Sequence, residues 1–184
     1  MTLRSSGQTC PLPTTSEYNL SVSIILAWQN GVVTFSDESS TIRRGIRFLN
    51  GRRQILIQDD ISGVPAGTNL QWRAHSNATI ETSGSNATLT LNGKTLSASI
   101  LNPSGLSFST MEAVPMPQDP PIPTGEYAEN PSNDGVTVLV IETTQGGDFS
   151  LQVLLNPQWE GMDASAFVSP PNIPIEQWSV TSHN

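Results

Sequence analysis

Residues 41–61 read TIRRGIRFLNGRRQILIQDDI, and this stretch decides the fold class. Apolar side chains alternate along both halves, at Ile42, Ile46 and Phe48 and again at Ile55 and Ile57. A period of two is typical of a strand with one buried face. Between the halves, residues 50–51 are Asn-Gly, which favours a two-residue type I′ turn because both residues tolerate positive φ. The stretch therefore predicts an antiparallel hairpin of residues 41–49 and 54–61.

The same signals recur along the rest of the chain. Further strands are predicted at residues 22–27, 32–35, 70–75, 78–81, 87–91, 96–100, 106–111, 136–142 and 149–155. A second Asn-Gly pair at residues 92–93 predicts another tight turn, and residues 136–142 and 149–155 are expected to form the last hairpin. No segment shows a sustained helical period. The pattern predicts an all-β fold, an antiparallel two-sheet β-sandwich with an irregular Pro-rich loop and irregular tails.

The distribution of proline sets the expected domain limits. Residues 1–17 are predicted to be an irregular lead-in, residues 18–156 the β-sandwich, and residues 157–184 a Pro-rich C-terminal tail. Residues 114–133 are also rich in proline, which cannot donate to a sheet ladder, and are expected to form an exposed loop.

Composition excludes several classes of function. Of 184 residues, 13% are charged, and the net charge of −8 disfavours nucleic acid as a partner. The single cysteine allows neither an internal disulfide nor a cysteine-based zinc site. Residues 20–28 are too short an apolar run to span a membrane, and residues 1–16 do not resemble a signal peptide. Glycosylation sequons at Asn19, Asn77 and Asn86 nevertheless favour an extracellular parent protein.

Five of the seven arginines fall within residues 43–53. The two-residue turn would place Leu49 opposite Arg52, Arg47 opposite Gln54, and Arg43 opposite Gln58. One face of the hairpin would then carry Arg43, Arg47, Arg52, Gln54 and Gln58. Guanidinium groups fork onto carboxylates and sulfates, so this face is a candidate site for an acidic sugar. The alternative is a solvated face whose arginines pair with the protein's own acids.

Only two histidines are present, His75 and His183, and no serine-hydrolase elbow or phosphate-binding loop occurs. Asp59 and His75 each end a predicted strand, so neighbouring strands would bring a carboxylate and an imidazole together. A metal requires three or four protein ligands, and this pair supplies two. The alternative is a histidine that a carboxylate or a backbone carbonyl holds in place.

Three stretches carry a resemblance to a known family: residues 44–49, residues 54–61, and Trp72-Arg-Ala-His75. Over roughly residues 40–160 the chain is similar to the C-terminal β-sandwich of heparinase II/III-like polysaccharide lyases. In that domain a hydrophobic strand ending in Asp is followed by a strand ending in Trp-x-x-His.

The resemblance implies a polysaccharide context. Such lyases cleave uronic-acid polysaccharides by β-elimination, and their tyrosine and most substrate contacts lie in an α/α toroid domain. Some members bind a structural zinc through two histidines and one aspartate, which Asp59 and His75 would match here. No histidine precedes Asp59, so the third ligand is missing, and we expect no tightly bound zinc and no other cofactor. No long helical segment that could form a toroid precedes the sandwich.

Three classes of function remain open. The first, which we favour, is a non-catalytic fragment or accessory domain, whose partner would be the missing toroid. The second is a carbohydrate-binding module for acidic polysaccharide, acting through the arginine face or through exposed tryptophans among Trp28, Trp72, Trp159 and Trp178. The third is an active lyase when joined to a toroid, although no acid/base pair is identifiable in this chain.

Overall fold

The computed structural model describes residues 31–36, 40–115, 133–162 and 164–178. In these residues the chain forms ten β-strands and two short 3₁₀ helices. Their bounds are β1 Gly31–Ser36, β2 Thr41–Leu49, β3 Gln54–Val64, β4 Leu70–Ser76, β5 Thr79–Ser83, β6 Asn86–Leu91, β7 Lys94–Asn102, β8 Phe108–Glu112, β9 Thr137–Thr143, β10 Gly147–Gln158, η1 Ala164–Ala166 and η2 Ile175–Gln177.

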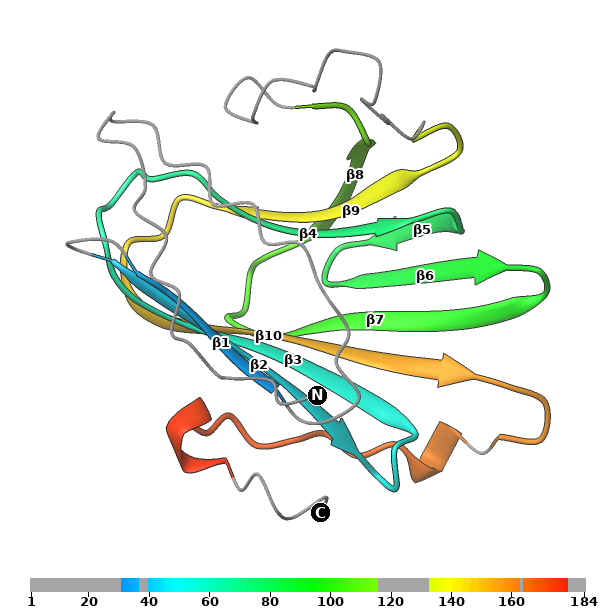
Figure 1. The fold of residues 1–184 in the computed structure, drawn as a ribbon. Helices are drawn as coiled ribbons and strands as arrows, with labels where there is room; N and C mark the ends of the chain where they lie inside the picture. Colours follow the sequence, from blue (N-terminus) through cyan, green and yellow to red (C-terminus); the bar gives the residue numbers. More distant parts are fainter. Residues whose placement is uncertain (1–30, 37–39, 116–132, 163, 179–184) are drawn as a thin grey trace, which may run out of the picture.

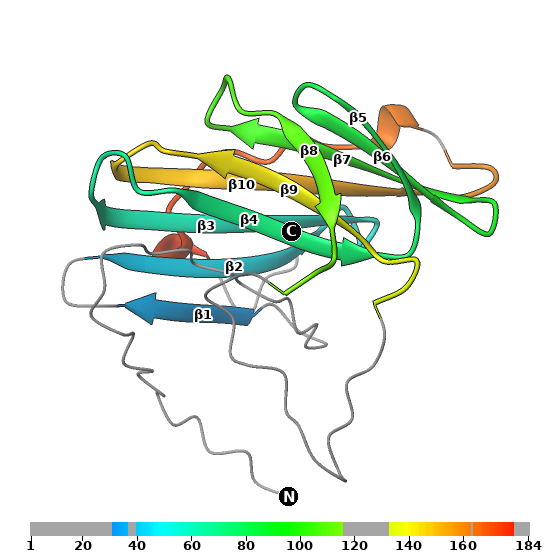
Figure 2. The same cartoon turned by 90° about the horizontal axis from the view of Figure 1, so that it is seen from above.

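The strands form two antiparallel sheets that face each other (Figure 1; Figure 2). The larger sheet has seven strands in the order β1-β2-β3-β10-β7-β6-β5, and the smaller has three in the order β4-β9-β8. The predicted all-β, two-sheet sandwich is confirmed. Every predicted strand that lies in the described residues overlaps an observed one, whereas residues 22–27 lie outside them.

The core lies between the two sheets and is built by the alternating apolar residues. Ile42, Ile57 and Ile61 of the large sheet pack with Trp72 and Ile141 of the small sheet, all less than 8% exposed. Trp72 meets the ring of Phe108 edge to face, with ring centroids 6.4 Å apart. Alternation thus places the apolar faces of these strands in a shared core, as a sandwich requires.

The predicted last hairpin is wrong. Strand β9 pairs with β4 and β8 in the small sheet, whereas β10 pairs with β3 and β7 in the large one. The segment between them therefore crosses from one sheet to the other, as does the segment between β3 and β4. The two connecting segments are hydrogen-bonded to each other, because the Gly67 amide of the first donates to the Thr144 carbonyl of the second at 3.2 Å.

The register of the β2–β3 hairpin also differs from the prediction. Leu49 lies opposite Gln54, Arg47 opposite Leu56, and Arg43 opposite Asp60. The connection has four residues, 50–53, and Asn50, Gly51 and Arg52 all have positive φ. In contrast, the predicted two-residue turn at residues 92–93 is confirmed, because Leu91 lies directly opposite Lys94.

Residues that follow the last strand are also part of the packed structure, as far as residue 178. Strand β10 continues to Gln158, two residues beyond the predicted limit of the sandwich. Residues 164–178, which we call the C-terminal strap, then lie along the outer surface of the large sheet (Figure 1, orange to red). No helix among the described residues is long and apolar enough to cross a membrane.

Candidate functional site

The outer face of strands β2, β3 and β10 carries the side chains that the sequence predicted for an acidic sugar. Arg43 and Arg47 project from β2 on this face, and Gln54 and Gln58 project from β3. The observed register differs from the predicted one by two residues, and a shift of two leaves every side chain on the same face of the sheet. The predicted grouping is thus correct for these four side chains, whereas Arg52 lies in the connecting turn.

This face is not the open surface that the prediction assumed. Gln54 and Gln58 are both 0% exposed, because the C-terminal strap covers them. Nε2 of Gln54 donates to the Val168 carbonyl at 3.1 Å, and its Oε1 accepts from the Val168 amide at 2.8 Å. Nε2 of Gln58 donates to the Ile173 carbonyl at 2.8 Å. The two glutamines therefore bind the backbone of the chain's own strap.

The arginines of the face also meet the strap. Nη1 of Arg43 lies 3.4 Å from the Glu176 carboxylate, and both side chains are substantially exposed, at 39% and 67%. The guanidinium carbon of Arg47 lies 5.9 Å from the centre of the Trp178 ring, within the range of a cation–π contact. An exposed ion pair of this kind stabilises the fold only slightly.

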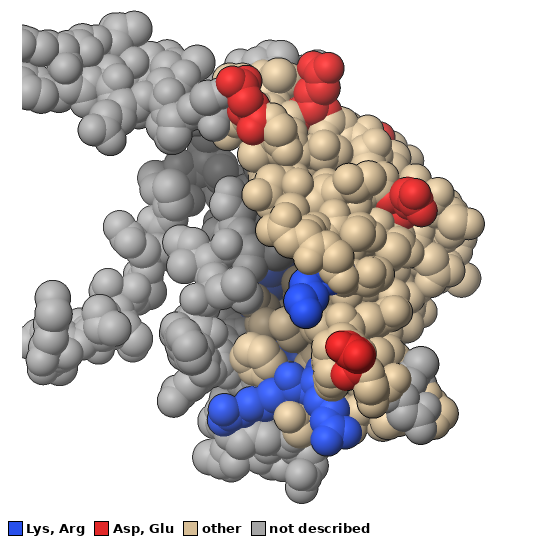
Figure 3. All heavy atoms as spheres, turned by 90° about the vertical axis from the view of Figure 1, so that its right-hand side faces the viewer, with Lys and Arg blue, Asp and Glu red and all other residues tan. Residues whose placement is uncertain are grey.

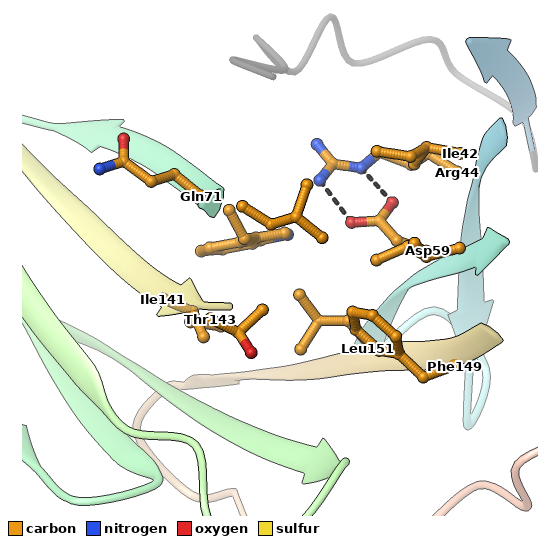
Figure 4. Close-up of a pocket in the computed structure, with 11 residues that line it drawn as sticks. Ile42, Arg44, Asp59, Gln71, Ile141, Thr143, Phe149 and Leu151 are labelled. Carbon is orange, nitrogen blue, oxygen red and sulfur yellow. Dashed lines mark hydrogen bonds and ion pairs between the residues drawn. The ribbon is translucent and has the colours of Figure 1, made fainter. Parts of the chain in front are cut away.

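On the opposite, inner face, Arg44 and Asp59 form a buried ion pair that sequence reasoning missed. Nε and Nη2 of Arg44 each donate to one oxygen of the Asp59 carboxylate at 2.6 Å (Figure 4). Both residues are at most 5% exposed and lie among the isoleucines of the core. The alternation contained the signal, since Arg44 lies on the same side of β2 as Ile42, and Asp59 on the same side of β3 as Ile57 and Ile61.

This ion pair borders a small cavity of about 30 Å³ between the sheets (Figure 4). Apolar side chains form most of its lining, with Arg44, Asp59, Gln71 and Thr143 as polar members. This space admits only a few water molecules, so the cavity is too small for a sugar ring. It is therefore not a closed cleft for a polysaccharide.

Asp59 and His75 do not form the pair that the sequence suggested. They lie on β3 and β4, which belong to different sheets, and both oxygens of Asp59 are engaged by Arg44. His75 is exposed near the end of β4, and its pKa is lowered by partial burial and by the positive charge of Arg73. Among the described residues, no three His, Cys, Asp or Glu side chains gather as metal ligands do.

The remaining sequence candidates are dispersed. Trp72 is buried in the core, Trp178 is half-buried in the strap, and Trp159 is 44% exposed. The sequon residues Asn77 and Asn86 are both exposed. Asn19, Trp28 and His183 lie outside the described residues.

Among the comparisons with known proteins, only the one with solved structures found a likeness. No protein-family model matches this chain, and no curated protein matches it. A solved structure of heparinase III with methylated lysines matches 72% of the chain, at 16% sequence identity and a TM-score of 0.47. The match covers 20% of that protein, so this chain corresponds to about a fifth of its length. This match is a partial structural likeness to one region of that heparinase III.

Proposed function

We propose that this chain is a non-catalytic β-sandwich domain that accompanies a polysaccharide-degrading domain, as the sequence resemblance implies. The main observation behind the proposal is that the carboxylate of Asp59 is bound by Arg44. The carboxylate that would match a family metal ligand is instead neutralised at both oxygens by Arg44. His75, the other matched residue, lies on the opposite sheet.

The available polar groups also support a structural role. Elimination next to a carboxylate requires a positioned base, a proton donor and a group that neutralises the substrate carboxylate. Gln54 and Gln58 of the outer face bind the strap, and Arg44 and Asp59 of the inner face bind each other. On this proposal the catalytic groups belong to a separate domain, for which an α/α toroid is the expected partner.

Incubation with acidic polysaccharides tests this proposal. The purified chain is mixed with glucuronan, alginate and heparan-type polymers, and the absorbance of the unsaturated product is followed. We expect no turnover above buffer. Turnover that disappears in a His75→Ala variant, but persists in a Lys94→Ala variant at an unrelated turn, would contradict the non-catalytic assignment.

We propose weak binding of acidic polysaccharide as a second function, at the turn between β2 and β3. Arg52 and Arg53 are both exposed at this turn, whereas Arg43 and Arg47 are engaged by the strap. Figure 3 shows basic side chains gathered low on this side of the molecule. Such binding would be sensitive to salt, because exposed charges are screened over about 10 Å at 0.1 M salt.

Titration at low and high salt tests this second function. An Arg52→Ala/Arg53→Ala variant should lose most of the low-salt binding, because its two exposed guanidinium groups are removed. A Lys94→Ala variant, which removes an exposed charge from the β6–β7 turn, should bind nearly as well as the wild type. Equal binding by all three proteins would exclude the β2–β3 turn as the site.

The extracellular setting of the parent protein is also a proposal. Asn77 and Asn86 are exposed within their sequons, so a transferase could reach both. Expression in a glycosylating host, followed by mass measurement of wild type and of Asn77→Gln and Asn86→Gln variants, tests for glycans at these positions.

A further inference from the structure

The contact between the C-terminal strap and the outer face has features of a peptide-binding site. The face recognises the strap's backbone at separate points, through Gln54 at Val168 and Gln58 at Ile173. A third point is the carboxylate of Asp60, whose Oδ2 accepts from the Ile175 amide at 2.7 Å. Backbone hydrogen bonds combined with side-chain pockets are a common mode of peptide recognition.

The recognising side chains are held in place by the sheet itself. Gln54 donates to the Asn156 side chain, and Gln58 accepts from Gln152, each at 2.8 Å. Asp60 accepts from Gln58 and from Ser150, both at 2.7 Å. These bonds lie within β3 and β10 and do not need the strap. The face is therefore preorganised, which lowers the entropy lost when a segment docks.

A slot on β2 provides the side-chain anchor. The ring of Trp178 lies over Gly45, so closely that a Cβ at Gly45 would come within 2.7 Å of it. Trp178 also packs against the apolar cluster of Leu49, Leu56 and Leu154 and contacts Arg47. Gly45 thus provides the space that the indole occupies, and a well-packed tryptophan is a typical energetic anchor of an interface.

The strap itself resembles a docked ligand more than a sheet strand. The bonds described above run from side chains of the sheet to the strap backbone, and an exposed turn at residues 159–161 joins the strap to β10. Pro170, Pro171 and Pro174 lie within the segment. Proline restricts the unbound chain, so less entropy is lost when the segment is ordered.

We propose that the outer face of β2, β3 and β10 is a binding site for an extended peptide segment, that residues 164–178 occupy it as a separable ligand, and that the same segment of a second copy of this chain can replace them. Recognition depends on the backbone at residues 168, 173 and 175 and on the indole at residue 178.

A labelled peptide of residues 164–178 tests the proposal on the full chain. In the wild type, the attached strap competes at an effective concentration on the order of mM, so the peptide should bind poorly. A Trp178→Ala protein keeps the face but weakens its own strap, and it should bind the wild-type peptide at least tenfold more tightly than the wild-type protein does. The peptide carrying Trp178→Ala should bind this protein at least tenfold more weakly.

A Gly45→Ala/Trp178→Ala protein is the matched control. Its added methyl group fills the slot, so affinity for the wild-type peptide should fall at least tenfold relative to Trp178→Ala alone. A folded Trp178→Ala protein that binds no peptide would overturn the proposal, as would binding that Gly45→Ala leaves unchanged.

Amide exchange in the wild type gives a test that does not depend on a folded variant. If the strap separates from the face without global unfolding, the amides of Val168 and Ile175 exchange at least tenfold faster than those of β9. Exchange of the two groups at equal rates would show that the strap opens only when the whole domain unfolds, and would overturn the proposal.

Discussion

At the residue scale, the pair of Arg44 and Asp59 explains the register of the β2–β3 hairpin. The two residues lie directly opposite each other, which allows the bidentate contact. The two-residue turn predicted from the sequence would instead place Arg44 opposite Ile57 and Asp59 opposite Ile42. It would place the two charges on a diagonal in an apolar core, where the direct contact at both carboxylate oxygens is lost and a poorly paired charge is costly. The longer turn avoids this cost.

Removal of one partner should therefore be far more harmful than removal of both. Asp59→Leu leaves the Arg44 charge buried, and we expect a loss of about 3–5 kcal/mol in the free energy of unfolding. The Arg44→Met/Asp59→Leu double variant should recover most of this loss, because apolar side chains suit the site. Urea denaturation measures both effects. Arg43→Ala, which removes an exposed charge, should change stability by less than about 1 kcal/mol. A double variant as unstable as Asp59→Leu would contradict the explanation.

His75 provides a prediction on pH dependence. Its pKa is lowered below 6.5 by partial burial and by Arg73, so the folded state binds fewer protons than the unfolded state in the window below 6.5. Stability should fall as the pH drops from 6.5 through this window, and the loss should end below the folded-state pKa. The change should be small because the side chain is exposed. An NMR titration of His75 with a midpoint at or above 6.5 would contradict this. A His75→Gln variant should lack this contribution to the pH dependence.

At the scale of elements, alternation predicts strands well because burial of one face acts on every second residue. It predicts pairing less well, because pairing depends on contacts between residues that are distant in the sequence. Strands β9 and β10 are adjacent in sequence and both apolar, yet they lie in different sheets. Likewise, the parity of Arg43, Arg47, Gln54 and Gln58 was predictable. Their coverage by residues more than a hundred positions away was not, since no local pattern marks it.

Three successive residues in the turn between β2 and β3 have positive φ, and they differ in how readily they adopt it. Asn50 and Gly51 adopt positive φ readily, whereas for Arg52, with φ of 69°, this conformation is strained. Arg52→Asn should therefore stabilise the protein by up to about 1 kcal/mol, since asparagine adopts this conformation more readily. Gly51→Ala, which introduces a Cβ at φ of 65° with no other atom within 4 Å, should destabilise it by about 1 kcal/mol. Thermal or urea unfolding measures both, and the same sign for the two changes would contradict this account of the turn.

At the scale of the whole molecule, the two sheets are joined at one end where the β3–β4 and β9–β10 connections cross. Gly146 in the second connection lies against the backbone of the first. A Cβ at Gly146 would come within 2.6 Å of both the Cα and the amide nitrogen of Ala66. The neighbouring bond from the Gly67 amide to the Thr144 carbonyl ties the same two segments together. The spacing of the sheets at this end thus depends on the absence of a side chain at one position.

Gly146→Ala should therefore force the two connections apart. Because the obstructing atoms are backbone, no rotamer change can relieve the contact, and we expect a loss of about 1–3 kcal/mol in the free energy of unfolding. Gly147→Ala is the matched control, since its φ of 80° adds local strain of about 1 kcal/mol but no other atom lies within 4 Å. The amide of Gly67 distinguishes the two changes. It should exchange at least tenfold faster in Gly146→Ala, where its acceptor moves away, and at nearly the wild-type rate in Gly147→Ala. Equal protection of Gly67 in both variants would mean that the connections do not hold the sheets together, and that the core alone sets their spacing.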